Sequence, residues 1–309
     1  MSTQEKYLNP FTDFGFKKLF GSDVNKDLLI HFLNSVLPKE ATITDLKYLK
    51  TEYLGQAKMD RKVIYDLYCE NEKGEKFIVE LQKARQEFFK EQTIFYSTFP
   101  LQEQAITGDW NFKLKAVYTV SILDFLIDDN SYSAKKREIE DKEPVKINVK
   151  LLNTDTHEVF YDKLTYIYIQ IPLFDKQEEE LETYEDKWFY IIKNLQKFKN
   201  RPQKLQERIF DKVFQTAELA KFDKKQRMAY EDSLKYYRDI KNVIDTAKKE
   251  SLKEGEEKGL KKGIKEGREI NQIENAKNAL LEGLSIEVTS KITKLSIEEI
   301  QKIADSLNK

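Results

Sequence analysis

Three polar residues lie where two strand-forming runs of the chain can bring them together: Asp66, Glu80 and Gln82. Alternate residues of a strand share one face of a sheet, so Glu80 and Gln82 point the same way. Two carboxylates with Cβ atoms about 5 Å apart on neighbouring strands repel each other unless a cation neutralises them. A divalent cation held by Asp66 and Glu80, with the carbonyl oxygen of Leu81 as a third ligand, would supply that charge.

This set of ligands favours a hard cation that binds oxygen: magnesium (Mg2+), manganese (Mn2+) or calcium. Mg2+ keeps several waters and takes substrate phosphate oxygens beside one or two carboxylates. Such an ion lowers the pKa of a bound water, so the expected chemistry is phosphodiester hydrolysis. Gln82 would orient the attacking water, because an amide cannot act as a base. Without a metal, Asp66 and Glu80 would be half-buried polar residues on a strand face.

A hairpin is expected to position the pair. Residues 63–69 and 77–81 are rich in strand formers, and Gly74 lies between them. A three-residue loop with Gly74 in the left-handed conformation connects such strands well. That loop places Asp66 directly opposite Glu80, and a slip of one residue would separate them.

The rest of the first half predicts a mixed sheet flanked by helices, an α/β fold. The expected elements are a helix over 10–38, an extended segment over 42–54, a helix over 84–106, and strands over 113–125, 145–152 and 164–173. Pro100 predicts a kink or a break in the second helix. A charged stretch, 128–143, is expected to be an exposed insertion.

The pattern becomes helical near residue 176, with a break at Pro202. Residues 248–268 carry four glycines spaced by four, which predicts a weak, exposed helix because each glycine costs about 1 kcal/mol relative to alanine. Residues 275–307 resemble a small helix-turn-helix unit, with Ser285 and Ser296 as N-caps. We therefore expect a core over 1–175, a helical region over 176–245 and a helical tail over 246–309.

Composition narrows the possible chemistry. The 53 Lys and Arg residues balance 54 Asp and Glu residues, which excludes a globally basic nucleic-acid coat but not a local basic groove. The single cysteine, Cys69, excludes an internal disulfide and a cysteine-built zinc site. Only His31 and His157 are histidines, so a three-histidine zinc site is excluded as well. We expect His31 to be structural, His157 to lie in a loop or edge strand, and Cys69 to be buried.

The chain shows no run of the roughly 18–20 apolar residues that a membrane span needs. The N-terminus shows no apolar core of a signal peptide. The simplest expected location is the cytoplasm.

Asp66 followed by Glu80-Leu81-Gln82 across a glycine turn resembles the PD-(D/E)XK nuclease signature in its E-x-Q form. Residues 9–21 (NPFTDFGFKKLFG) are similar to the start of one branch of that superfamily, the Rpn-like recombination-promoting nucleases, which are also described as transposases. The resemblance covers about residues 7–173, and the EG..KG units of the tail resemble the tails of many members.

The resemblance implies a restriction-endonuclease-like fold and a metal-dependent DNA endonuclease. Asp66 and Glu80 would be the metal ligands. Gln82 occupies the position where most of the superfamily has a lysine, so the usual cation at the scissile phosphate is missing. Lys17, Lys90 or a lysine elsewhere could replace it, whereas Lys83 is expected to point to the other face of the strand.

Two further positions bear on phosphate chemistry. Many relatives carry a basic residue near Gln92, so Gln92 would weaken phosphate binding. Asp13 could assist at the active site, as an acid on the first helix often does in this superfamily. Its alternative role is a first-turn acid that interacts favourably with the helix dipole.

Three hypotheses follow. The first is an endonuclease of low sequence specificity acting on double-stranded DNA, as a homodimer joined through the helical region, since cutting both strands needs two active sites. The second is a catalytically weak DNA-binding or protein-interaction module of the same fold. The third is a structural oligomeriser built by residues 178–309.

Overall fold

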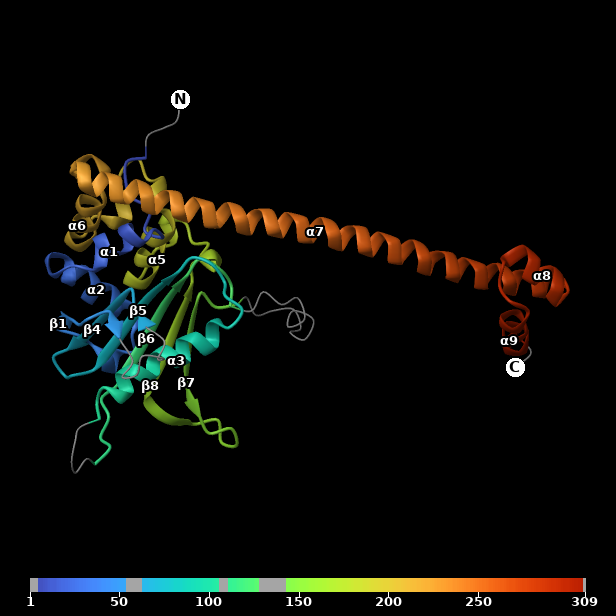
Figure 1. The fold of residues 1–309 in the computed structure, drawn as a ribbon, viewed down its shortest axis with the longest axis horizontal. Helices are drawn as coiled ribbons and strands as arrows, with labels where there is room; N and C mark the ends of the chain where they lie inside the picture. Colours follow the sequence, from blue (N-terminus) through green and yellow to red (C-terminus); the bar gives the residue numbers. More distant parts are fainter. Residues whose placement is uncertain (1–4, 54–62, 106–110, 128–142, 308–309) are drawn as a thin grey trace. The chain divides into compact units, whose positions relative to one another are not determined.

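A computed structural model describes residues 5–53, 63–105, 111–127 and 143–307. The chain divides into two compact units, Met1–Lys241 and Asn242–Lys309, each of which has its own contacts (Figure 1). The three-part division expected from composition stays a prediction. The predicted insertion at 128–143 lies, except for its last residue, outside the described residues.

A six-stranded mixed sheet forms the centre of the first unit, in the order β1-β4-β5-β6-β8-β7. Its strands are β1 Leu46–Tyr48, β4 Leu67–Asn71, β5 Lys76–Gln82, β6 Val117–Leu123, β7 Lys146–Leu152 and β8 Val159–Gln170. The three strands β5, β6 and β8 are parallel to one another, and the other pairings are antiparallel. All seven residues of β6 are buried, as expected of a central parallel strand covered on both faces. The mixed sheet expected from the sequence is confirmed.

A separate two-stranded sheet pairs β2 Glu52–Tyr53 with β3 Val63–Ile64. The sequence predicted one continuous strand over 63–69, and this prediction was wrong. The chain leaves β3 at Tyr65 and enters β4 at Leu67, so Asp66 lies at the junction between the two sheets.

Helices cover both faces of the six-stranded sheet (Figure 1). They are α1 Asp13–Phe20, α2 Lys26–Val36, α3 Phe89–Gln102, α5 Tyr184–Asn194 and α6 Arg208–Ala217. Short 3₁₀ helices connect the elements at Asp23–Asn25, Lys39–Ala41, Ile171–Leu173, Glu178–Glu180, Leu195–Lys197, Gln203–Leu205 and Leu219–Lys221.

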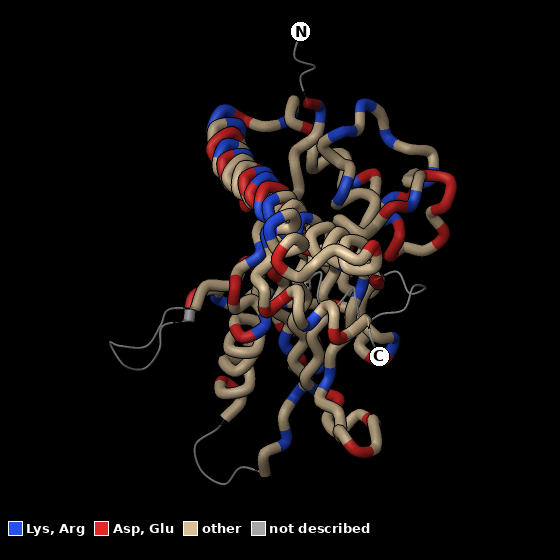
Figure 2. Tube along the Cα trace, turned by 90° about the vertical axis from the view of Figure 1, so that its right-hand side faces the viewer, with Lys and Arg blue, Asp and Glu red and all other residues tan. Residues whose placement is uncertain are grey.

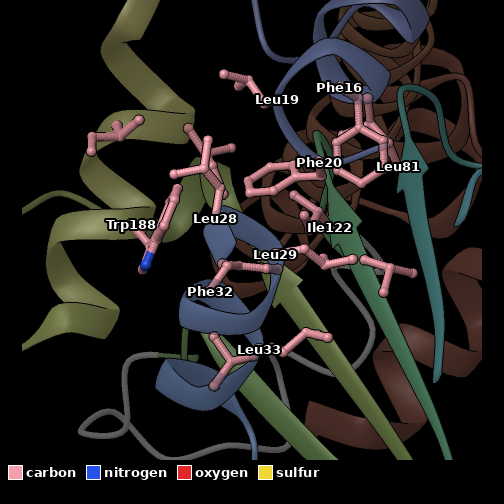
Figure 3. Packing of buried hydrophobic residues seen from close by; sticks show 14 of the residues in the cluster. Phe16, Leu19, Phe20, Leu28, Leu29, Phe32, Leu33, Leu81, Ile122 and Trp188 are labelled. Atoms are coloured by element: carbon pink, nitrogen blue, oxygen red, sulfur yellow. The ribbon is translucent and has the colours of Figure 1, made fainter. Parts of the chain in front are cut away.

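The main core lies between the sheet and helices α1, α2, α5 and α6. Leu29 of α2, Trp188 of α5 and Phe210 of α6 are fully buried in one cluster with sheet residues that include Val79 and Ile122. Figure 3 shows the part of this packing around Trp188. The opposite face of the sheet packs against α3 through two smaller clusters.

Two helix predictions needed correction, and a predicted helix break was confirmed. The single helix predicted over 10–38 is two helices, because α1 ends at a Gly21 C-cap whose N–H donates to the Lys17 carbonyl. The helix predicted over 84–106 is shorter and continues through Pro100 to its end at Gln102. The predicted break at Pro202 is confirmed, since this residue lies between α5 and α6 at the start of a 3₁₀ helix.

Helix α7 Lys224–Leu281 begins in the first unit and ends in the second. The four glycines of its middle part have nothing within 4 Å of an added Cβ, so this helix face is exposed, as predicted. Figure 2 shows Lys and Arg interspersed with Asp and Glu along the chain, in keeping with the net charge of -1.

The second unit ends in α8 Ile286–Thr293 and α9 Ile297–Leu307. Ser285 caps α8 and Ser296 caps α9, each by accepting a backbone N–H three residues on. Thr289 and Ile300 are buried, so the last helices share a small core. The helices expected over 275–307 are present, and their interpretation as a helix-turn-helix unit stays a prediction.

The beginning of the chain is bound to the beginning of α7. The Asn9 N–H donates to the Tyr230 hydroxyl at 3.0 Å, and the Phe14 N–H donates to the Ser233 hydroxyl at 3.1 Å. A Cβ at Gly15 would lie 2.2 Å from the Asn9 carbonyl oxygen, which no backbone tolerates. Only glycine therefore fits where the first turn of α1 passes the preceding loop.

Candidate active site

The hairpin that precedes the site has the register that the sequence predicted. Leu67 faces Val79 and Cys69 faces Phe77, and Gly74 has a positive φ of 77°. Extended by one residue, the same register places Asp66 opposite Glu80.

The antiparallel ladder ends beside this pair, and its ending shapes the site. The Tyr65 N–H donates to the Thr51 carbonyl at 2.9 Å, so Tyr65 does not pair with Leu81. The Leu81 N–H donates instead to Asp66 Oδ2 at 2.7 Å, and the Asp66 N–H donates to Glu80 Oε1 at 3.3 Å. The N–H and C=O of a strand residue point to the same side, so the Leu81 carbonyl also lies at this end of the ladder.

Burial makes this carboxylate pair unstable when both groups are charged. Glu80 is only 6 % exposed, and its pKa is raised well above the ordinary value by burial and then by the charge of Asp66. The pKa of Asp66 is raised as well, chiefly by burial, and the Leu81 N–H partly opposes this rise. Among the described residues, no hydrogen-bond donor contacts the second oxygen of either carboxyl group. A bound proton or a cation would each relieve the repulsion within this pair, and the two carboxyl oxygens without a donor are ligands that a cation could use.

Three charged residues act on Asp66 from outside the hairpin. Asp13 forms a 3.0 Å ion pair with Lys17 along α1, and the charge of Asp13 raises the pKa of Asp66. The charges of Lys17 and Lys83 lower the pKa of Asp66. The structure thus brings Asp13 and Lys17 into electrostatic range of the carboxylate pair.

Lys83 follows the last residue of β5, and its Nζ lies 5.7 Å from the centroid of the Tyr236 ring. Burial lowers the pKa of its ammonium group, while the charges of Asp13 and Asp66 raise it. Strand alternation alone did not reveal that Lys83 interacts electrostatically with Asp66. Lys90 lies exposed in the first turn of α3.

Gln82 and Gln92, which stand at the two positions where the resemblance implies a basic residue, have different surroundings. Gln82 is partly buried at the end of β5, beside Leu123 of β6. Gln92 lies on α3 and donates from Nε2 to the Tyr96 hydroxyl at 3.1 Å. Neither side chain carries the positive charge that a phosphate would attract.

Sequence reasoning missed Ser121, which lies beside Glu80 in the parallel register of β5 and β6. Its side chain is fully buried, and its hydroxyl has no hydrogen-bond partner among the described residues. The available signal was a serine within an otherwise apolar central strand.

The two histidines and the cysteine lie where the sequence predicted: His31 in a packing contact, His157 in a turn and Cys69 in the core. His31 Nδ1 accepts the Trp188 indole N–H at 2.9 Å, and burial lowers the pKa of the imidazole. His157 lies in the turn between β7 and β8 with a φ of 58°. Cys69 is buried, which raises the pKa of its thiol to about 12.

The donor set suits Mg2+ better than a softer metal. Within the described residues, no group of three or more His, Cys, Asp or Glu side chains could hold a metal. The site offers two carboxylates and a peptide carbonyl, all of them hard oxygen ligands, and Mg2+ is commonly bound by so few protein atoms. Asp66, Glu80 and Leu81 therefore fit the ion that the resemblance implies.

A family model described as PD-(D/E)XK nuclease family transposase matches residues 10–247. The chain belongs to this family, as its E-x-Q strand and opening segment predicted. No curated protein and no solved structure matches the chain. In the part of the chain that the structure describes, none of the helices has the length and apolarity to cross a membrane.

Proposed function

We propose that the chain is a metal-dependent DNA endonuclease of low sequence specificity that uses Mg2+, for which Mn2+ can substitute. The observation that carries this proposal is the pair of the partly buried Asp66 and the buried Glu80, joined by the Asp66 N–H at a strand end, in a chain of a nuclease family. Burying two like charges is unfavourable unless a ligand compensates for it. A divalent cation is the ligand that both the pair and the family favour.

Each residue of the site has a role in this proposal. Asp66 and Glu80 hold the ion through their carboxylates, and the Leu81 carbonyl adds a third oxygen. When bound, the ion supplies an activated water and charge stabilisation at phosphorus. Gln82, on the same strand face as Glu80, orients the attacking water, and Asp13 assists from α1. The water oxygen would bond to phosphorus as the bond from phosphorus to the sugar 3′ oxygen breaks; the proton of the water would pass to solvent, and the leaving oxygen would take a proton from solvent.

Lys83 supplies the cation that the E-x-Q motif lacks at Gln82. The support is its electrostatic interaction with Asp66 and Asp13, together with its place directly after β5. Lys17 interacts with Asp66 too, but its ammonium is already paired with Asp13 at 3.0 Å. Lys83 is therefore the better candidate to contact the scissile phosphate.

Plasmid cleavage tests the proposal. Purified full-length protein is incubated with supercoiled plasmid and Mg2+, beside EDTA, an Asp66→Asn variant and an Asp245→Asn control on an exposed face of α7. Nicking that requires Mg2+ and Asp66, and that survives Asp245→Asn, supports the nuclease. Cleavage that persists in Asp66→Asn would place the site elsewhere or reveal a contaminant.

A second candidate function is a catalytically weak DNA-binding or protein-interaction module. It is favoured by the uncharged Gln82 and by Gln92, whose amide donates to Tyr96 rather than to a ligand. A gel shift of the same plasmid without cleavage in Mg2+ or Mn2+ would favour this function.

Cleavage of both strands requires two sites, so we also propose a homodimer joined through the helical region. Light scattering after gel filtration measures the mass directly, and a monomer would contradict it. We expect the protein to act in the cytoplasm.

A further inference from the structure

A cleft of about 630 Å³ lies at the start of α3 and holds aromatic side chains exposed to solvent. Phe88 is 64 % exposed and Phe95 is 47 % exposed, although both are large and apolar. The Phe95 ring is held edge-on by Phe99, with ring centroids 5.2 Å apart. Tyr96, also in the cleft wall, packs edge-on against Tyr65 at 5.8 Å. The cleft thus presents aromatic rings to solvent, and two of them, Phe95 and Tyr96, pack against neighbouring rings.

The polar groups of this cleft accept hydrogen bonds and repel anions. Glu87 and Glu91 both line it. Gln92 lines it as well; its Oε1 is buried and has no donor among the described residues, while its Nε2 donates to Tyr96, so the exposed acceptors are the carboxylates of Glu87 and Glu91. A phosphate would meet like charge here. A flat aromatic molecule with N–H donors on its edge would find both stacking rings and acceptors.

The cleft is close to the carboxylate pair. Val63, in its wall, lies three residues before Asp66, and Gln86, also in its wall, lies four residues after Gln82. Three or four residues span at most about 14 Å even when fully extended. A nucleotide next to the scissile one is therefore within reach of the aromatic rings.

Resting on the nuclease function proposed above, we infer that this cleft binds an unpaired nucleobase of the DNA strand next to the scissile phosphate. All nucleobases have a face that stacks on an aromatic ring, and their amino and imino N–H groups match the acceptors in the cleft. A base paired within a duplex has its faces and its pairing edge occupied. The preferred substrate is thus DNA with an unpaired base, such as a bulge, a flap or a single-stranded gap.

Binding in EDTA tests this inference without cleavage. The anisotropy of dye-labelled DNA gives the Kd of the full-length protein for a duplex with one bulged base and for its fully paired counterpart. The variants are Phe88→Ala and Phe95→Ala, with Phe88→Tyr as the conservative replacement. Ile94→Ala is the matched control, because Ile94 is 54 % exposed on the same helix but does not line the cleft.

Wild type, Ile94→Ala and Phe88→Tyr should bind the bulged duplex about tenfold more tightly than the paired one, as expected for one stacked base. Phe88→Ala and Phe95→Ala should both lose this preference. Phe88→Ala should also keep the wild-type melting temperature, because its ring is 64 % exposed, which separates lost stacking from lost stability. Equal binding of the two duplexes by wild type, or a preference that survives both alanine variants, would overturn the inference.

The two proposals fail in different ways. Mg2+-dependent cleavage without a preference for unpaired bases would overturn the base site and leave the nuclease in place. A preference that depends on Phe88 and Phe95, without any cleavage, would overturn the nuclease and leave the base site in place.

Discussion

The backbone N–H of Asp66 donates to Glu80 Oε1 at 3.3 Å, so the Glu80 carboxylate is bound to the backbone of the residue opposite it across the end of the hairpin. This hydrogen bond holds the Glu80 side chain against the Asp66 backbone. The arrangement is strained only when both groups are ionised, and this makes the pair measurable in the absence of DNA.

We expect Glu80→Gln to stabilise the metal-free protein near neutral pH. The amide keeps an oxygen for the Asp66 N–H and removes a buried charge whose pKa burial and Asp66 raise. Each unit by which a folded-state pKa exceeds the unfolded one corresponds to about 1.4 kcal/mol of lost stability above that pKa. Urea unfolding in EDTA measures the gain, and a less stable variant would contradict this expectation.

The same pair predicts the pH dependence of the metal-free protein. A carboxyl group whose folded pKa is raised binds more protons in the folded state, so stability falls as pH rises. The contribution is fully present below the unfolded pKa, near 4, and is lost as pH rises through the folded pKa. Wild type in EDTA should therefore lose stability above pH 4 faster than Glu80→Gln. Parallel curves for the two proteins would argue against a strained pair.

Mg2+ should raise the melting temperature of wild type, more at pH 8 than at pH 5, because the ligands must be ionised to bind it. Asp66→Asn should show a much smaller rise. Differential scanning calorimetry at fixed ionic strength separates this effect from general salt screening, with Asp245→Asn as the control. An identical shift in Asp66→Asn would mean that the ion binds elsewhere.

Lys83→Met should lower plasmid cleavage by about tenfold or more, because it removes a cation that interacts with Asp66 and Asp13 beside the proposed phosphate position. Lys90→Met, an exposed lysine on α3, should keep at least half of the wild-type rate. Initial nicking rates at saturating Mg2+ provide the comparison. If the Lys90 variant lost activity and the Lys83 variant did not, α3 would supply the cation instead.

Gly15→Ala should destabilise the first unit by about 1–3 kcal/mol, as overpacking does, since the added Cβ would meet the Asn9 carbonyl at 2.2 Å. Gly255→Ala is the opposite case: nothing lies within 4 Å of the added Cβ, and alanine favours a helix by about 1 kcal/mol. Circular dichroism should show lower thermal stability for the first variant and equal or higher helicity for the second.

Local rules predicted the parts of the site that lie within one hairpin. Gly74 and the alternation of the two strands were enough to place Asp66 opposite Glu80. Capping rules likewise placed Ser285 and Ser296 at helix starts. In both cases the interacting residues are close in the sequence, so short-range geometry determines the outcome.

The features of the site that were not predicted depend on contacts between segments that are distant in the sequence or on where a strand ends. The strand predicted over 63–69 is interrupted at Tyr65, because the Tyr65 N–H donates to the Thr51 carbonyl. No periodicity in the sequence encodes a pairing between two-residue strands. Lys83 interacts with Asp66 at the point where the strand has ended and alternation no longer applies. Ser121 joins Glu80 only through the parallel pairing of β5 with β6, which no local pattern specifies.

The bond between Asn9 and Tyr230 joins residues 221 positions apart, and Leu8 and Leu219 add two backbone bonds between the same distant segments. During synthesis at about 5–20 residues per second, the opening segment waits roughly 10–45 s for these partners to emerge from the ribosome. The hairpin with Asp66 and Glu80 is closed by residues close in the sequence, but the bond from Asn9, just before α1, can form only after Tyr230 has been made. A growing or prematurely terminated chain that lacks Tyr230 therefore lacks this bond to the segment before α1, the helix that carries Asp13.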